Sequence, residues 1–252
     1  MAPGTFRRLD QELVARGLAA TRSRAQALIK GGSVSLRGRV CTKPSAQVGP
    51  DDSLAVSRGE DYASRGALKL LGALEAFTGS GLPGPMGRSC LDIGASTGGF
   101  TDVLLRRGAS RVIALDVGHG QLIDRLAEDP RVVEMSGVNI RQVGPEDLPY
   151  RPDYVVSDVS FISLTYVIPV LPALIAAETE CLLLVKPQFE VGREHLGHHG
   201  IVKDERERRQ ALDRVCDCAM ESGFTVRGVA VSPIKGVHGN VEYLLWLGFH
   251  RV

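Results

Sequence analysis

One segment indicates the fold more clearly than any other: Leu91-Asp92-Ile93-Gly94-Ala95-Ser96-Thr97-Gly98-Gly99-Phe100. It starts as an apolar run typical of a buried strand, passes through a glycine-rich turn and opens a segment typical of a helix. Because glycine carries no Cβ, the N–H groups of such a turn can approach a ligand closely. The next apolar run ends in Asp116, 22 residues after Gly94, where a carboxylate can accept hydrogen bonds from ribose hydroxyls.

Two ligands compete for this turn. A dinucleotide site favours the spacing G-x-G-x-x-G, whose second glycine makes room for the pyrophosphate. Here Ser96 occupies that second position, and the glycines stand at 94, 98 and 99. S-adenosylmethionine has no pyrophosphate and tolerates this looser spacing behind an acidic strand end such as Asp92, so we expect the methyl donor. A glycine turn that serves only tight strand–helix packing is the remaining alternative.

From residue 62 onward the chain alternates apolar runs with helical segments. Strands are expected at 90–93, 112–116, 132–135, 154–157, 181–185, 225–231 and 241–247, and helices at 65–77, 100–107, 121–127, 164–177 and 204–222. This alternation predicts an α/β fold of the Rossmann-like methyltransferase type, a mostly parallel seven-stranded sheet with helices on both faces. The last two strands are joined only by a loop, which predicts an antiparallel strand at or near one edge.

The N-terminal segment differs in both charge and pattern. Residues 1–50 carry nine Lys and Arg against two carboxylates, a net charge of +7, which leaves −6 for the rest of the chain. Such an asymmetry is typical of a basic element that meets a polyanion, although a solvated basic surface has the same composition. Two short helices and short strands are expected here, with Thr21 or Ser23 as an N-cap. We therefore expect a small α+β RNA-binding domain at 1–57, a linker at 58–63 and a methyltransferase domain at 64–252.

The cysteines and the apolar runs bear on the compartment. The five cysteines are odd in number and form no C-x-x-C pair, which favours reduced thiols in a cytoplasmic protein over a disulfide framework or a zinc site. The N-terminus lacks the apolar core of a signal peptide. The longest apolar stretch, residues 166–177, contains Pro169 and Pro172 and is shorter than the roughly 20 residues that span a bilayer. No membrane span is expected.

Four charged residues occur where apolar ones would be expected. Lys69 interrupts the apolar stripe of a predicted helix, Asp158 and Lys186 each follow a buried strand, and Glu242 falls in the last predicted strand. In open α/β sheets, ligands bind beyond the carboxyl ends of the strands. A ribose 2′-hydroxyl is a weak nucleophile that needs a positioned base or a cation. Any one of these residues reads equally well as a surface charge, but the four together predict a site for 2′-oxygen chemistry.

The chain resembles the TlyA-type rRNA methyltransferases, the group also called haemolysin A, over essentially its whole length. These proteins join an S4-type RNA-binding domain to an FtsJ-like 2′-O-methyltransferase. The motifs that carry the resemblance are Arg8-Leu9-Asp10, Thr21-Arg22-Ser23-Arg24-Ala25, Tyr62-Ala63-Ser64-Arg65-Gly66-Ala67-Leu68-Lys69-Leu70, the glycine turn quoted above with Thr101, Ser157-Asp158-Val159-Ser160-Phe161-Ile162-Ser163 and Val185-Lys186-Pro187-Gln188-Phe189-Glu190.

The resemblance implies roles for individual residues. The catalytic Lys-Asp-Lys-Glu tetrad falls on Lys69, Asp158, Lys186 and Glu242, with Lys186 central to activating the 2′-hydroxyl. S-adenosylmethionine is expected to bind at Asp92, Gly94, Ser96, Gly98, Asp116 and Asn139. Ribosomal RNA, free or within a ribosomal subunit, is expected to contact Arg8, Arg22, Arg24, Lys30 and Arg65. Family substrates are cytidine riboses in 23S rRNA and, in some members, also 16S rRNA; a chain ending soon after Leu247 resembles the subtype that modifies the large subunit.

Three other interpretations compete with that of an rRNA methyltransferase. A membrane-active haemolysin is disfavoured because no long basic amphipathic helix is present. A non-catalytic rRNA-binding assembly factor is disfavoured by the intact tetrad and glycine turn. A metal site at His195, His198 and His199 has loose spacing within the glycine-containing stretch 192–200, which favours a loop over the active site. We therefore expect no metal.

Overall fold

The computed structural model describes residues 6–56, 62–192, 196–236 and 239–251. The chain forms two compact units that divide between residues 61 and 62. Each unit has its own apolar core.

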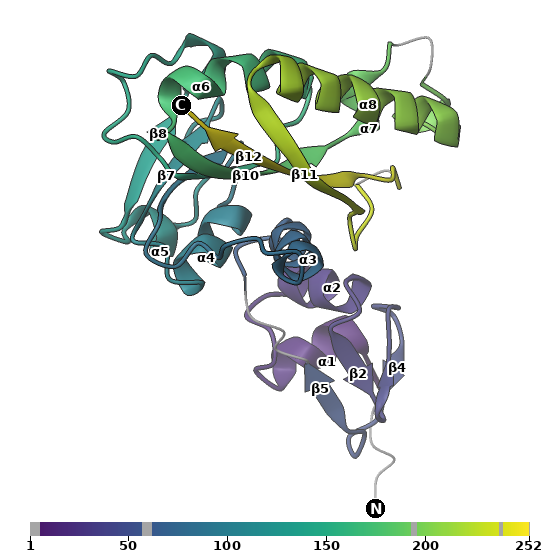
Figure 1. Ribbon diagram of the computed structural model, residues 1–252. Helices are drawn as coiled ribbons and strands as arrows, with labels where there is room; N and C mark the ends of the chain where they lie inside the picture. The colour runs from purple at the N-terminus through teal and green to yellow at the C-terminus, as the bar shows by residue number, and fades with distance from the viewer. Residues whose placement is uncertain (1–5, 57–61, 193–195, 237–238, 252) are drawn as a thin grey trace, which may run out of the picture. The chain divides into compact units, whose positions relative to one another are not determined.

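The N-terminal unit is a small α+β structure (Figure 1). Its elements are β1 (Arg7–Arg8), α1 (Leu9–Ala15), α2 (Arg22–Lys30), β2 (Val34–Leu36), β3 (Arg39–Val40), β4 (Gln47–Val48) and β5 (Leu54–Val56). Strands pair antiparallel in the order β3-β2-β5, and β1 pairs with β4. Thr21 is the N-cap of α2, since its side chain accepts a hydrogen bond from Arg24 N at 3.2 Å.

The C-terminal unit is built on a seven-stranded sheet in the order β11-β12-β10-β9-β6-β7-β8. The strands are β6 (Ser89–Ile93), β7 (Arg111–Asp116), β8 (Val132–Ser136), β9 (Tyr154–Ser157), β10 (Glu178–Val185), β11 (Phe224–Val231) and β12 (Tyr243–His250). Strand β12 runs antiparallel to both of its neighbours, while the pairs from β10 to β8 are parallel. The predicted fold class is confirmed, and the antiparallel strand lies second from the edge.

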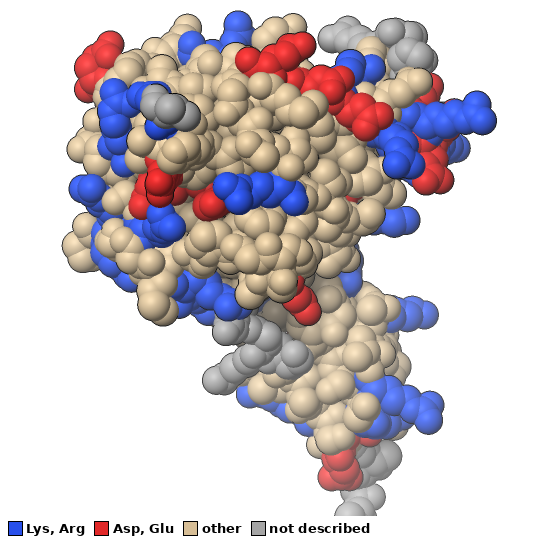
Figure 2. Space-filling view, in the orientation of Figure 1, with Lys and Arg blue, Asp and Glu red and all other residues tan. Residues whose placement is uncertain are grey.

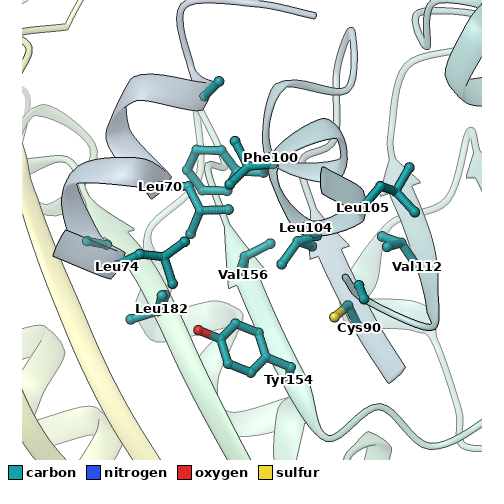
Figure 3. Packing of buried hydrophobic residues seen from close by; sticks show 14 of the residues in the cluster. Leu70, Leu74, Cys90, Phe100, Leu104, Leu105, Val112, Tyr154, Val156 and Leu182 are labelled. Atoms are coloured by element: carbon teal, nitrogen blue, oxygen red, sulfur yellow. The ribbon is translucent and has the colours of Figure 1, made fainter. Parts of the chain in front are cut away.

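Helices cover both faces of this sheet (Figure 1). The two layers contain α3 (Ala67–Thr78), α4 (Gly99–Arg106) and α5 (Asp124–Ala127) on one face, and α6 (Leu171–Leu174) and α8 (Glu205–Glu221) on the other. Leu70 and Leu74 of α3 and Leu104 of α4 pack over Tyr154 and Val156 of the central strand β9 (Figure 3). This packing holds α3, which carries Lys69, against the middle of the sheet.

Two predicted helices are wrong in extent. In place of a helix over 164–177, 3₁₀ turns at Leu164–Tyr166 and Ile168–Val170 precede the four-residue α6. Pro169 and Pro172 are the physical reason, because proline has no N–H to donate and clashes with the preceding turn. The helix expected over 121–127 is reduced to α5, with Ile123 as its extended N-cap.

Candidate active site

The glycine turn joins β6 to α4 as predicted. Gly94 has a φ of +85°, and a Cβ placed there would come within 3.1 Å of the backbone oxygen of Asp158. Gly98 has a φ of +97° and is the N-cap of α4. Both positions therefore require glycine, the first because the segment after β9 passes close to the turn and the second because of its left-handed backbone.

Asp92 lies beneath this turn. Its Oδ2 accepts hydrogen bonds from Thr101 N at 2.9 Å and Thr101 Oγ1 at 2.7 Å, which ties β6 to the first turn of α4. The side chain is fully buried, and this burial raises the pKa of Asp92 to about 7, against the opposing effect of the two Thr101 hydrogen bonds. The structure thus places Asp92 as a support of the turn.

A large hollow of ≈1430 Å³ lies beside the turn, and most of the predicted cofactor residues line it. Gly94, Ser96, Asp116 and Asn139 line it, whereas Asp92 and Gly98 are absent from its lining as far as the described residues show. Asp116 Oδ2 accepts from Ser96 N at 2.8 Å, and Oδ1 accepts from Gly118 N at 2.7 Å. Asn139 caps a 3₁₀ turn by accepting from Arg141 N.

The four charged residues of the predicted tetrad come together at the carboxyl end of the sheet. Lys69 Nζ donates to Asp158 Oδ2 at 3.2 Å and lies 2.9 Å from Glu242 Oε2. Lys186 Nζ lies 2.6 Å from Asp158 Oδ1. The charges alternate in the order Glu242, Lys69, Asp158, Lys186 and cancel. This alternation is the condition under which charged groups tolerate burial.

Burial differs along this row. The exposed fraction of the side chain is 2% for Glu242, 12% for Lys69, 8% for Lys186 and 19% for Asp158. Glu242 immediately precedes β12, so its predicted place within the last strand is wrong by one residue. Lys69, Asp158 and Lys186 line a smaller hollow of ≈330 Å³, and Glu242 lies behind Lys69. The two lysines and Asp158 are therefore the members of the row that face this hollow.

The smaller and larger hollows meet. Gly94, Ser96, Asp158 and Ser160 line both of them. A ligand bound along the glycine turn therefore lies next to the charged row.

The segment after β9, and residues 189 and 190 that contact it, contribute side chains that the sequence did not single out. Ser160 Oγ accepts a hydrogen bond from Lys186 Nζ at 2.8 Å. Phe161 has a φ of +65°, is 92% exposed, and its ring centre lies 5.2 Å from that of Phe189. Glu190 accepts from Ser163 Oγ and Leu164 N. These residues stood within the motifs used above, but only tertiary contacts distinguish them from their neighbours.

In the N-terminal unit, two of the predicted RNA-binding arginines share one buried carboxylate. Arg8 donates to both oxygens of Asp10 at 3.0 and 3.1 Å, and Arg22 Nε donates to Oδ2 at 3.0 Å. Gln26 Nε2 adds a fourth hydrogen bond at 2.8 Å. The hydrogen bond from Arg8, with those from Gln26 and Arg22, holds the pKa of Asp10 well below its usual range. Asp10 thus orders two guanidinium groups at the surface.

The other predicted RNA contacts lie in different places. Arg24 and Lys30 are exposed on α2, and Figure 2 shows Lys and Arg side chains on the surface of the N-terminal unit. Arg65 belongs to the C-terminal unit, where it lines the smaller hollow. A basic side chain there can bind an anionic group such as a phosphate.

Two alternatives concern metals and membranes. Of the proposed histidines, His195 lies outside the described residues. Across the described ranges, no group of three or more His, Cys, Asp or Glu residues is arranged to hold a metal ion. Nor does any described helix combine the length and apolarity that crossing a membrane requires.

Comparison with known proteins gives consistent matches. The family model of FtsJ-like methyltransferases matches residues 62–249, and that of S4 domains matches residues 7–54. The chain is 48% identical over 242 residues to the 16S/23S rRNA (cytidine-2'-O)-methyltransferase TlyA of Mycobacterium tuberculosis, covering 95% of this chain and 89% of the relative. Hemolysin A of Brachyspira hyodysenteriae is 38% identical, with coverages of 94% and 98%. A solved structure described as a hemolysin from Streptococcus thermophilus has a TM-score of 0.75 at 38% identity, covering 99% of this chain and 90% of that one.

Proposed function

The chain belongs to the TlyA-type branch of the FtsJ-like methyltransferase family, and we propose that it methylates the 2′-oxygen of a cytidine ribose in ribosomal RNA. S-adenosylmethionine is the methyl donor of this family. The observation that carries the proposal is the meeting of the two hollows at Gly94, Ser96, Asp158 and Ser160. A donor beside the glycine turn and a hydroxyl beside Lys186 are then neighbours, as direct transfer requires.

The larger hollow suits the methyl donor chemically. Asp116 at the end of β7 offers carboxylate oxygens of the kind that bind ribose hydroxyls, and Gly94 leaves backbone room beside them. When bound, S-adenosylmethionine supplies a methyl group activated by a sulfonium centre.

The charged row suits a hydroxyl nucleophile. In the proposed reaction the ammonium of Lys186 stabilises the negative charge that develops on the 2′-oxygen. Asp158 holds both lysines, Oδ1 toward Lys186 and Oδ2 toward Lys69. Glu242 holds Lys69 from the far side. The fixed positions matter because they remove the need to reorganise charges as the reaction proceeds.

The two-unit composition supports ribosomal RNA as the substrate. An S4 domain brings the array Arg8, Arg22, Arg24 and Lys30, whose charge suits phosphates and carries no base specificity. The relative from Mycobacterium tuberculosis is named for cytidine methylation in both 16S and 23S rRNA. We propose 23S rRNA as the main substrate of this chain, with 16S rRNA as a second candidate.

The test is a methyl-transfer assay with labelled S-adenosylmethionine and separate 30S and 50S subunits that lack the modification. We expect the label in the large-subunit RNA, at the 2′-oxygen of a cytidine, as determined by mapping the labelled nucleotide. Label on a base nitrogen or carbon would overturn the 2′-oxygen assignment, and label confined to 30S subunits would overturn the choice of 23S rRNA.

A further inference from the structure

The hydrogen bonding of Lys186 extends beyond the four charged residues. Its Nζ forms an ion pair with Asp158 Oδ1 at 2.6 Å. The same ammonium donates a hydrogen bond to Ser160 Oγ at 2.8 Å. A hydrogen bond favours a narrow range of donor–acceptor directions. The carboxylate of Asp158 and the hydroxyl of Ser160 therefore together fix where the Lys186 ammonium points.

Ser160 also lies where orientation matters most. It lines both hollows, together with Gly94, Ser96 and Asp158. An ammonium has three N–H groups, and the contacts with Asp158 and Ser160 set its placement. An N–H group of Lys186 that neither contact uses can then donate a hydrogen bond to a substrate oxygen at the junction of the hollows.

The segment that carries Ser160 is held against α7 (Pro187–Glu190) by further contacts. The ring centres of Phe161 and Phe189 lie 5.2 Å apart. Glu190 accepts from Ser163 Oγ at 2.5 Å and from Leu164 N at 2.9 Å. These contacts join residues 160–164 to residues 186–190. Ser160 thus lies on a segment that packing and hydrogen bonds hold in place.

We propose that Ser160 is a positioning residue of the methyl-transfer site, which orients the Lys186 ammonium toward the 2′-hydroxyl. The inference rests on the proposed function and adds a fifth polar member to the row. The proposed role of Ser160 acts through its hydrogen bond with Lys186 and involves no proton transfer by Ser160 itself.

The test compares Ser160→Ala, Ser160→Thr and the control Ser110→Ala in the full chain with its ribosomal substrate. Ser110 Oγ also makes one hydrogen bond of 2.8 Å, to Arg88 O, at the opposite end of the strands. We expect kcat to fall about 10- to 100-fold in Ser160→Ala. The KM for S-adenosylmethionine, the affinity for RNA and the Tm should stay within about twofold or 2 °C of the wild type. The threonine variant, which keeps the hydroxyl, should recover most of kcat, and Ser110→Ala should match the wild type.

Three outcomes overturn the inference. These are a wild-type kcat in Ser160→Ala, a threonine variant as slow as the alanine variant, or a loss shared equally by Ser110→Ala. Lys186→Ala in the same assay separates this inference from the proposed function. If Lys186→Ala is inactive while Ser160→Ala is normal, only the role of Ser160 fails; if Lys186→Ala turns over normally, the tetrad fails as well.

Discussion

The ammonium of Lys69 lies 2.9 Å from the carboxylate of Glu242, whose side chain is only 2% exposed. The two residues come from the first helix and the last strand region of the C-terminal unit. The buried carboxylate of Glu242 therefore has Lys69 as its ion-pair partner, and the same ammonium also contacts Asp158. The charged row therefore forms only when the C-terminal unit is folded, and the position of each member depends on the charged residues that it contacts.

Lys186→Ala should abolish methyl transfer and leave cofactor binding nearly intact. The ammonium faces the smaller hollow, whereas Asp116 and Asn139 of the proposed cofactor site line the larger one. We expect kcat to fall by at least about 10³-fold, since a charge-stabilising group at the reacting atom contributes on that order. Calorimetric titration with S-adenosylmethionine should give a Kd within about threefold of the wild type. A variant with wild-type turnover would remove Lys186 from the mechanism.

Lys69→Met should lower the stability of the protein, because it removes the ion-pair partner of a buried carboxylate. The substitution leaves Glu242 buried without its counter-ion, which costs on the order of 3 kcal/mol. Such a loss lowers Tm by roughly 6–12 °C in a domain of this size. Adding Glu242→Gln should restore part of that loss, because the stranded charge is removed. The four proteins of this cycle are compared by calorimetry, and additive losses would show that the pair is not coupled.

Asp92→Asn should change how stability depends on pH. The pKa of Asp92 rises from its ordinary 3.8 to about 7 on folding, so the folded state holds the proton more tightly. Stability from this group is therefore present at low pH and is lost as pH rises from about 4 to about 7. Asparagine does not titrate and keeps an oxygen for the two Thr101 donors. As the pH rises from about 4 to about 7, the variant should gain stability relative to the wild type, as measured by urea unfolding; parallel curves would contradict the assignment.

Asp10→Asn should weaken RNA binding even though it makes the protein more basic. The charge change alone favours a polyanion, but loss of the carboxylate releases Arg8 and Arg22 from their fixed positions. We expect affinity for the substrate rRNA to drop about tenfold at constant salt. The control Asp51→Asn makes the same charge change at an exposed position in the same unit and should bind slightly more tightly. Tighter binding by both variants would show that charge, and not the order of the arginines, governs recognition.

The local sequence was sufficient to predict the elements around the cofactor site. Strand, glycine turn and helix follow one another within a dozen residues, so the motif from Leu91 to Phe100 specifies them without distant contacts. The same pattern failed over residues 164–177, where apolar spacing suggested one helix and two prolines interrupt it. Residue type alone also singled out Lys69, Asp158, Lys186 and Glu242 as charges in apolar surroundings.

The amino-acid sequence alone therefore specifies the kind of fold and the types of side chain available to a site. Which side chains meet depends on three-dimensional packing, which brings Lys69 to Glu242 and Lys186 to Ser160. These pairings depend on strand order and register in the sheet and on the packing of α3 across it. A hydrogen bond or ion pair is decided within a few tenths of an ångström between residues far apart in the chain, and local periodicity carries no such information.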